Sequence, residues 1–151
     1  VLLVPGSSPQ HPEKRWPAAS YGALARMLID RGLTPVLLGT EAEAEATAAV
    51  ADVAPESLDL TGRTSIFEIG GLAERAVGAV GNDTGPMHLI AAKGCPSVVL
   101  YSGATRPSQT AQRGPAVTIL QEADLATLPP ERVADALAAL QTSQDQEQAV
   151  G

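Results

Sequence analysis

The stretch "AVGAVGNDTGPMHLIAAKG" (76–94) decides the fold, because it joins a strand pattern to a helix pattern through one short polar corner. Residues 76–83 form an apolar run that predicts a buried strand. Residues 85–94 have a proline near their start and a glycine at their end, which is the asymmetry expected of a helix. A buried strand that passes directly into a helix is the building unit of a parallel α/β sheet.

The same alternation of strand and helix continues along the rest of the chain. Apolar runs predict further strands at 1–4, 34–39, 58–62, 96–103 and 116–120. Helical patterns lie at 20–32, 41–54, 65–76 and 131–140. Ser20 is the candidate cap of the first helix, and Gly32 is its closing residue.

The strand runs are short and do not alternate with polar residues, so both faces of the sheet should be covered. The sequence therefore predicts an α/β fold: a Rossmann-like, doubly wound parallel sheet of about six strands. A single domain is expected over 1–141, followed by a polar, disordered tail at 142–151.

Composition agrees with a globular domain. Of the 151 residues, 44% are hydrophobic and 3% are aromatic, so the core should consist of alanine, valine, leucine and isoleucine. The formal net charge of −7 argues against a nonspecific nucleic-acid binder, which normally has a basic face. The single cysteine, Cys95, lies in an apolar stretch and is expected to be a small buried hydrophobe.

No stretch approaches the roughly 20 apolar residues of a membrane span, and no signal peptide is expected. The chain opens directly on the strand at 1–4 without an initiator methionine. We therefore expect it to be part of a longer protein.

Sheets of this kind bind ligands outside the carboxyl ends of their strands. The segments predicted at that edge are 5–17, 39–41, 61–65, 81–85 and 102–115. Polar and charged residues are concentrated in these segments, so the candidate site residues are sought there.

The first of these segments, "PGSSPQHPEKRWP" (5–17), suits a phosphate group. Gly6 lets the backbone approach a ligand closely. Ser7 and Ser8 supply hydroxyl and amide donors, and Lys14 adds positive charge. The spacing matches neither the P-loop nor the GxGxxG dinucleotide motif. The alternative is a solvated loop in which the basic pair Lys14 and Arg15 binds no ligand.

The polar corner "GNDTG" is the second candidate. With Thr84 or Gly85 near the N-cap, the first free amides of the following helix point outward, and the positive end of the helix dipole favours an anion. Pro86 has no amide hydrogen, so Gly85 and Met87 are the expected donors.

His88 lies one helical turn beyond Thr84 on the same face, so its imidazole could reach the same ligand. Asp83 is harder to explain beside a phosphate, because like charges repel. Asp83 could cap the helix, bind sugar hydroxyls or hold His88, and the residues alone do not choose.

Two further positions lie at the same edge. Glu41 could accept hydrogen bonds from ribose hydroxyls, or it could be a first-turn acid of the helix that follows. Thr64, in "RTS" (63–65), belongs either to a helix cap or to the edge of a ligand site. Glu43 and Glu45 are better explained as part of a solvated helix face.

The segments "PGSSPQHPEKRWP", "VLLGTEAE", "DLTGRTS" and "VGNDTGPMHLIAAKGCPSVVLYSGATRP" resemble, in order and spacing, the C-terminal domain of the family 9 glycosyltransferases. That family includes the ADP-heptose:lipopolysaccharide heptosyltransferases. The resemblance covers the chain to about residue 120 and is most specific in the combination of "KRWP" with "GNDTGPMHL". It implies one half of a GT-B fold, in which two Rossmann-like domains face each other across a cleft.

The resemblance also implies roles for single residues. Contacts to the donor diphosphate are implied for Ser7, Ser8, Lys14, Thr84 and Gly85. Contacts to the sugar are implied for Asp83 and His88, and contacts to the nucleoside for Glu41 and Thr64.

In this family the N-terminal domain supplies the acceptor site and the proposed catalytic base, an aspartate, and neither lies within these residues. By itself the chain should therefore bind a donor weakly and transfer nothing. The implied reaction is inversion at the anomeric carbon by in-line attack of the acceptor hydroxyl, with no cofactor and no metal. Lys14 and the helix amides would meet the charge of the leaving diphosphate.

The implied donor is an ADP-sugar carrying heptose or a related sugar, and the implied acceptor is the lipopolysaccharide core, reached through the missing domain. No nucleic-acid partner is expected, in keeping with the net negative charge. It implies a cytoplasmic protein at the inner face of the inner membrane of a Gram-negative bacterium, with peripheral membrane association only for the full-length parent.

Two other hypotheses remain open. A stand-alone, non-catalytic nucleotide- or anion-binding module would have no further α/β pattern upstream of Val1. Another GT-B enzyme, such as a sugar-nucleotide epimerase, would turn over a UDP-sugar without any acceptor.

Overall fold

The computed structural model describes residues 1–6, 15–103 and 116–150, with the backbone alone for 148–150. Ser7, Ser8 and Lys14 therefore lie outside the described residues.

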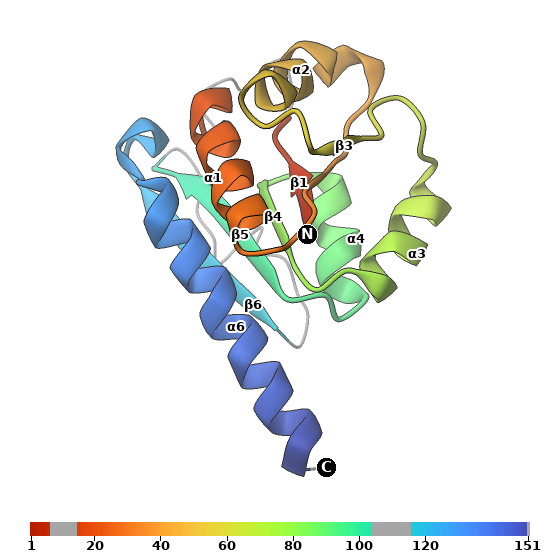
Figure 1. The fold of residues 1–151 in the computed structure, drawn as a ribbon, viewed down its shortest axis with the longest axis vertical. Helices are drawn as coiled ribbons and strands as arrows, with labels where there is room; N and C mark the ends of the chain where they lie inside the picture. Colours follow the sequence, from red (N-terminus) through yellow and green to blue (C-terminus); the bar gives the residue numbers. More distant parts are fainter. Residues whose placement is uncertain (7–14, 104–115, 151) are drawn as a thin grey trace.

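Six parallel strands form one sheet within this part of the chain, in the order β3-β2-β1-β4-β5-β6 (Figure 1). The strands are β1 (Leu2–Val4), β2 (Val36–Leu37), β3 (Leu58–Asp59), β4 (Ala79–Asn82), β5 (Ser97–Ser102) and β6 (Val117–Glu122). In the register, Leu3 lies opposite Leu37 on one side and Val80 on the other. This strand order is that of a Rossmann fold, so the predicted doubly wound parallel sheet is confirmed.

Strands β2 and β3 are shorter than the predicted runs 34–39 and 58–62, with two residues each. Both residues of β3 are exposed, because β3 is the edge strand of the sheet. Backbone pairing nevertheless continues past the assigned ends, since Leu60 N donates to Leu37 O at 3.0 Å.

The helices cover both faces of the sheet (Figure 1). On one face lie α1 (Ala18–Asp30), α2 (Ala44–Val53) and α6 (Pro130–Val150); on the other lie α3 (Ile66–Arg75) and α4 (Gly85–Ala92). Two short 3₁₀ turns, η2 (Glu41–Glu43) and η3 (Leu125–Thr127), precede α2 and α6.

The core has two halves because neighbouring residues of each strand point to opposite faces. One half, beneath α1 and α6, includes Leu3, Val80, Val98 and Leu100. The other half, beneath α3 and α4, includes Leu2, Ala79, Val99 and Tyr101. Burial on both faces is the physical reason for the continuous apolar strand runs in the sequence.

Helix α1 begins at Ala18 with Pro17 as its N-cap, so the predicted cap at Ser20 is wrong. The Pro17 carbonyl already accepts hydrogen bonds from Ser20 N and Tyr21 N, at 2.9 and 3.1 Å. Gly32 ends the helix at φ 81, as the sequence predicts, because glycine adopts this conformation without a steric cost.

Helix α6 continues to Val150, so its predicted end at Leu140 is wrong. The stretch expected as a disordered tail is helical through Val150. No glycine or proline occurs from Glu131 to Val150, so nothing in that stretch stops the helix once it has formed.

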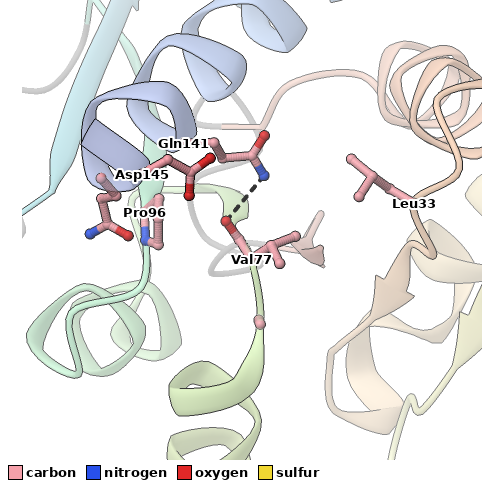
Figure 2. A pocket seen from close by; sticks show the side chains of 7 residues that line it. Leu33, Val77, Pro96, Gln141 and Asp145 are labelled. Atoms are coloured by element: carbon pink, nitrogen blue, oxygen red, sulfur yellow. Dashed lines mark hydrogen bonds between the residues drawn. The ribbon is translucent and has the colours of Figure 1, made fainter. Parts of the chain in front are cut away.

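The extended part of α6 contacts the amino end of the sheet. Gln141 Nε2 donates to Val77 O at 3.1 Å, and Gln144 Nε2 donates to Gly94 O at 3.4 Å. Figure 2 shows the first of these bonds beside a hollow of about 390 Å³. No helix in the described part of the chain is long and apolar enough to cross a membrane.

Candidate functional site at the carboxyl edge

The switch point of the sheet lies between β1 and β4, which are neighbours in the sheet but far apart in the sequence. The chain continues from β1 to α1 on one face and from β4 to α4 on the other. In open α/β sheets, ligands bind where two such connections diverge. The segments that meet at this point are the residues after Val4 and the corner 83–85.

Asn82, the last residue of β4, is fully buried and joins the two strand ends. Its Nδ2 donates to Pro5 O at 3.0 Å and to Gly6 O at 3.3 Å. Its Oδ1 accepts from Trp16 N and from the Tyr21 hydroxyl, both at 3.0 Å. The sequence analysis gives Asn82 no role. The sequence signal that could have found it is an asparagine that ends an apolar strand run directly before Asp83.

Helix α4 begins at Gly85, with Thr84 as its N-cap in an extended conformation. A threonine at this position normally accepts a backbone hydrogen bond with its hydroxyl. Here Thr84 Oγ1 is buried and has no hydrogen-bond partner among the described residues. The first-turn amides have no acceptor within a helix, and Pro86 supplies no amide hydrogen. A buried hydroxyl and the positive end of a helix thus meet at one point, which suits an anionic group.

Asp83 and His88 are neighbours at the same corner. Asp83 Oδ1 lies 3.8 Å from His88 Nε2, and the Asp83 side chain is 10% exposed against 47% for His88. His88 is therefore the open member of the pair and Asp83 the buried one. Of the three roles left open for Asp83, contact with His88 is observed, while the N-cap position belongs to Thr84. Binding of sugar hydroxyls stays a prediction.

Glu41 starts η2 and packs against the turn that follows β3. A Cβ added to Gly62 would lie 3.0 Å from Glu41 Cγ, and Gly62 has φ 70. Gly62 N donates to Gly39 O at 2.8 Å, which ties this turn to the end of β2. Thr64, with Arg63, lines a hollow of about 710 Å³ beside α3. The residues expected to hold a nucleoside thus belong to two adjacent turns.

Glu43 is half-buried, so its interpretation as part of a solvated helix face is wrong. Its carboxylate accepts from Thr40 N at 2.5 Å in a capping box. A Cβ added to Gly6 would lie 2.5 Å from Glu43 Cγ, so only glycine allows this approach between the end of β1 and η2. The spacing Thr-x-x-Glu at 40–43 is the sequence signal that could have found the capping box.

The predicted site residues that the structure describes form two groups on either side of β1. Glu41 and Thr64 follow β2 and β3, whereas Asp83, Thr84, Gly85 and His88 follow β4. Adjacent strands lie about 4.8 Å apart, so three steps from β3 to β4 span roughly 14 Å. An extended ligand that reached both groups would cross the carboxyl end of β1 near Gly6.

No three His, Cys, Asp or Glu side chains of residues 1–6, 15–103 and 116–150 gather to hold a metal ion. Cys95 is buried, and burial raises the pKa of its thiol to about 11, so it stays protonated at neutral pH. Its expected role as a small buried hydrophobe is confirmed.

The family model described as "Glycosyltransferase family 9 (heptosyltransferase)" matches residues 1–138. Lipooligosaccharide heptosyltransferase 2 of Haemophilus influenzae is 34% identical over 115 residues, which cover 73% of this chain and 33% of that relative. Lipopolysaccharide heptosyltransferase 2 of Escherichia coli K12 is 36% identical over 104 residues, which cover 66% of this chain and 30% of that relative. The match therefore spans about a third of each relative.

Solved structures agree with this result. The E. coli ADP-heptose lipopolysaccharide heptosyltransferase II superposes with a TM-score of 0.87 at 28% identity, over 95% of this chain and 46% of that one. An E. coli heptosyltransferase crystallised with ADP shares the fold with a TM-score of 0.82 at 22% identity, over 92% of this chain and 43% of that one. This chain thus corresponds to less than half of either protein.

Proposed function

The chain belongs to glycosyltransferase family 9, and from this premise we propose that it is the donor-binding part of a heptosyltransferase. The donor is an ADP-sugar carrying heptose, and the acceptor is a lipopolysaccharide core. The names of the relatives support this proposal, since one is an ADP-heptose lipopolysaccharide heptosyltransferase with the same fold over 46% of its length. The observation that carries it is the buried hydroxyl of Thr84 at the start of α4, which has no partner among residues 1–6, 15–103 and 116–150.

In this proposal the donor lies across the carboxyl end of β1. The nucleoside is held on the side of Glu41 and Thr64, and the diphosphate on the side of Thr84 and Gly85. The order of the strands supports this direction, because β1 lies between β2 and β4. Ser7, Ser8 and Lys14 complete the diphosphate contacts in the proposal.

The chemistry proposed for this part of the enzyme is stabilisation of the leaving group. As the bond from the anomeric carbon to the diphosphate breaks, negative charge grows on the diphosphate oxygens. The positive end of α4 and the Thr84 hydroxyl are oriented before the reaction, so they stabilise this charge without reorganising. The acceptor hydroxyl attacks from the opposite side of the sugar, which inverts the configuration, and the group that activates it lies outside this chain.

Asp83 and His88 are proposed to bind the sugar. A carboxylate repels a diphosphate but accepts hydrogen bonds from hydroxyl groups. Asp83 is the more buried of the two and contacts His88. In the proposal, the Asp83 carboxylate accepts hydrogen bonds from the sugar hydroxyls, and the exposed imidazole of His88 contacts the same ring. The proposal includes neither a metal nor a cofactor. It places the enzyme in the cytoplasm of a Gram-negative bacterium, at the inner membrane where its acceptor is found.

The first test replaces Thr84 by valine, which keeps the shape of the side chain and removes its hydroxyl. We expect the Kd for ADP to rise about tenfold, since one hydrogen bond to a charged ligand is lost. The free energy of unfolding should stay equal or rise, because the lost hydroxyl has no hydrogen-bond partner in the part of the chain that the structure describes. Calorimetric titration with ADP and urea denaturation measure the two quantities. Thr142→Val in the exposed part of α6 is the matched control, and unchanged ADP affinity in Thr84→Val contradicts the proposed site.

The second test separates the proposed enzyme from the two other hypotheses. The complete gene product is incubated with ADP-heptose, with and without a lipopolysaccharide core acceptor, and released ADP is measured. Acceptor-dependent release of ADP is expected. Binding of ADP without any release would favour a non-catalytic module. Turnover of a UDP-sugar in the absence of acceptor would favour an epimerase.

A further inference from the structure

We infer that Asn82 is a positioning residue, which holds the end of β1 and the corner after β4 at the spacing that the donor requires. The inference rests on the proposed function and adds to it a residue that does not itself touch the donor. Asn82 lies between the two halves of the candidate site, because Asp83 and Thr84 follow it directly and its side chain reaches the backbone beyond β1.

The hydrogen bonds of Asn82 use every donor and acceptor that its side chain has. An asparagine amide offers two N–H donors and two acceptor lone pairs. Nδ2 donates to the carbonyls of Pro5 and Gly6, and Oδ1 accepts from Trp16 N and the Tyr21 hydroxyl. Carbonyl oxygens only accept hydrogen bonds, so the amide nitrogen of Asn82 must face Pro5 O and Gly6 O. These contacts therefore fix which way the side-chain amide is oriented.

The partners of Asn82 lie on both sides of segment 7–14 in the sequence. Pro5 and Gly6 precede the segment 7–14, and Trp16 follows it. One side chain therefore fixes where the backbone enters this segment and where it leaves. Because Asn82 is completely buried, a smaller side chain leaves its polar partners without hydrogen bonds, and a larger one does not fit.

Trp16, after segment 7–14, has two contacts with the core besides its hydrogen bond to Asn82. Trp16 Nε1 donates to Leu128 O at 3.0 Å, and the Trp16 ring packs edge-on against Tyr21 with centroids 4.8 Å apart. Trp16 is thus anchored in the core even without Asn82. Loss of the amide should therefore release Pro5 and Gly6 first, and these residues lie at the proposed crossing point of the donor.

The experiment compares Asn82→Ala with two controls in the complete gene product. Tyr21→Phe removes one hydrogen bond to the same amide and leaves those to Pro5 and Gly6 in place. Leu137→Ala removes buried volume beside Gly78, at the amino end of β4, and so lowers stability away from the site. All titrations are made well below the melting temperature of each variant, so that every sample is folded.

We expect Asn82→Ala to raise the Kd for ADP, and the KM for the ADP-sugar, by about tenfold to a hundredfold, as is typical when a supporting residue of a binding site is lost. Both controls should bind ADP as the wild type does, although they are less stable. Amide hydrogen exchange gives a readout that needs no ligand. Exchange in residues 2–6, relative to exchange in α3, should be several-fold faster in Asn82→Ala than in either control, because these residues lose the two hydrogen bonds from Asn82 Nδ2.

Two results would overturn the inference. If folded Asn82→Ala binds ADP as tightly as the controls, Asn82 has a structural role only. If exchange in residues 2–6 is equal in all variants, Asn82 does not hold the backbone that follows β1. Failure of the proposed function looks different, because then the wild type itself binds no ADP, and hydrogen exchange still decides whether Asn82 holds Pro5 and Gly6.

Discussion

The two ends of the β-sheet differ in how their polar groups are satisfied. At the amino end, the side chain of Gln141 in α6 donates a hydrogen bond to Val77 O, beside a hollow (Figure 2). The backbone carbonyl of Val77 is thus satisfied by the protein itself. At the carboxyl end, the hydroxyls of Thr84 and Ser102 are buried and have no partner in the described part of the chain. Ser57, before β3, is a third such hydroxyl among the described residues, and nothing in the structure explains it.

This difference separates a structural end from a binding end. A buried polar group without a partner costs about 1–3 kcal/mol, so folding alone gives no reason to keep one. A ligand that supplies the missing hydrogen bond gives such a reason at Thr84, where the helix dipole also favours negative charge. At the amino end, α6 supplies partners for the carbonyls of Val77 and Gly94, and the Ser57 hydroxyl is the exception among the described residues. Substitutions at the two ends should therefore separate stability from ADP binding.

The largest expected loss of stability follows Leu137→Ala in α6. Leu137 is 1% exposed and packs against Gly78, so the substitution leaves a cavity. The free energy of unfolding should fall by about 2–5 kcal/mol, measured by urea denaturation. Leu137→Met, which keeps most of the volume, should lose less than about 1.5 kcal/mol. A marked loss of ADP affinity in folded Leu137→Ala would remove the distinction between the two ends.

Gly6→Ala is the counterpart at the carboxyl end. The new Cβ would lie 2.5 Å from Glu43 Cγ and 2.8 Å from Glu43 Cδ, so the capping carboxylate must move. We expect a loss of about 1–3 kcal/mol of stability together with weaker ADP binding, measured by denaturation and calorimetry. The control is Gly71→Ala in α3, where the added Cβ meets no atom within 4 Å. That control should gain roughly 0.5–1 kcal/mol, because alanine favours the helix.

Gln141→Ala tests the amino end of the sheet with a smaller expected loss of stability than Leu137→Ala. It removes the hydrogen bond to Val77 O, so stability should fall by about 0.5–1.5 kcal/mol in thermal or urea denaturation. ADP affinity should not change. Gln146→Ala, an exposed residue of the same helix, is the control and should have almost no effect. Equal stability of the two variants would show that the polar bond at the amino end contributes nothing.

The smallest expected effect concerns the cap of α3. Glu68 accepts from Ser65 N at 3.0 Å, and the hydrogen bonds from Ser65 lower the pKa of the Glu68 carboxyl below its ordinary value of 4.5. A carboxyl with a lowered pKa stabilises the folded state above its ordinary value, and this contribution is lost as pH falls through the lowered pKa. Glu68→Gln should therefore be slightly less stable at neutral pH and equal to the wild type well below pH 4.5. Melting curves across this range, with Glu147→Gln as control, measure the difference; a gap that widens on acidification contradicts the assignment.

The order of strands and helices could be predicted from the sequence because it depends on local patterns. Short apolar runs, turn glycines and first-turn prolines act over a few residues, and they locate all six strands of the described sheet. Helix ends were less certain, as Pro17 in place of Ser20 and the continuation of α6 show. The end of a helix depends on which neighbouring groups satisfy its last backbone atoms, and these groups come from elsewhere in the chain.

The candidate site was predicted in part for the same reason. Thr84 and His88 could be found because a strand-to-helix corner with a cap residue is visible in one short stretch. Asn82 was missed, since its partners Pro5 and Gly6 are 77 and 76 residues away in the sequence. Glu43 was missed because its packing against Gly6 depends on the adjacency of β1 and β2.

By itself, then, the sequence determined a parallel α/β domain with its chemistry at the carboxyl edge, because periodicity and turn chemistry are local properties of the chain. Only the tertiary structure decided which polar groups are paired and which are left over. It gave the Asn82 side chain four partners and left the Thr84 hydroxyl with none among the described residues, since pairing depends on distances between strands that the sequence separates.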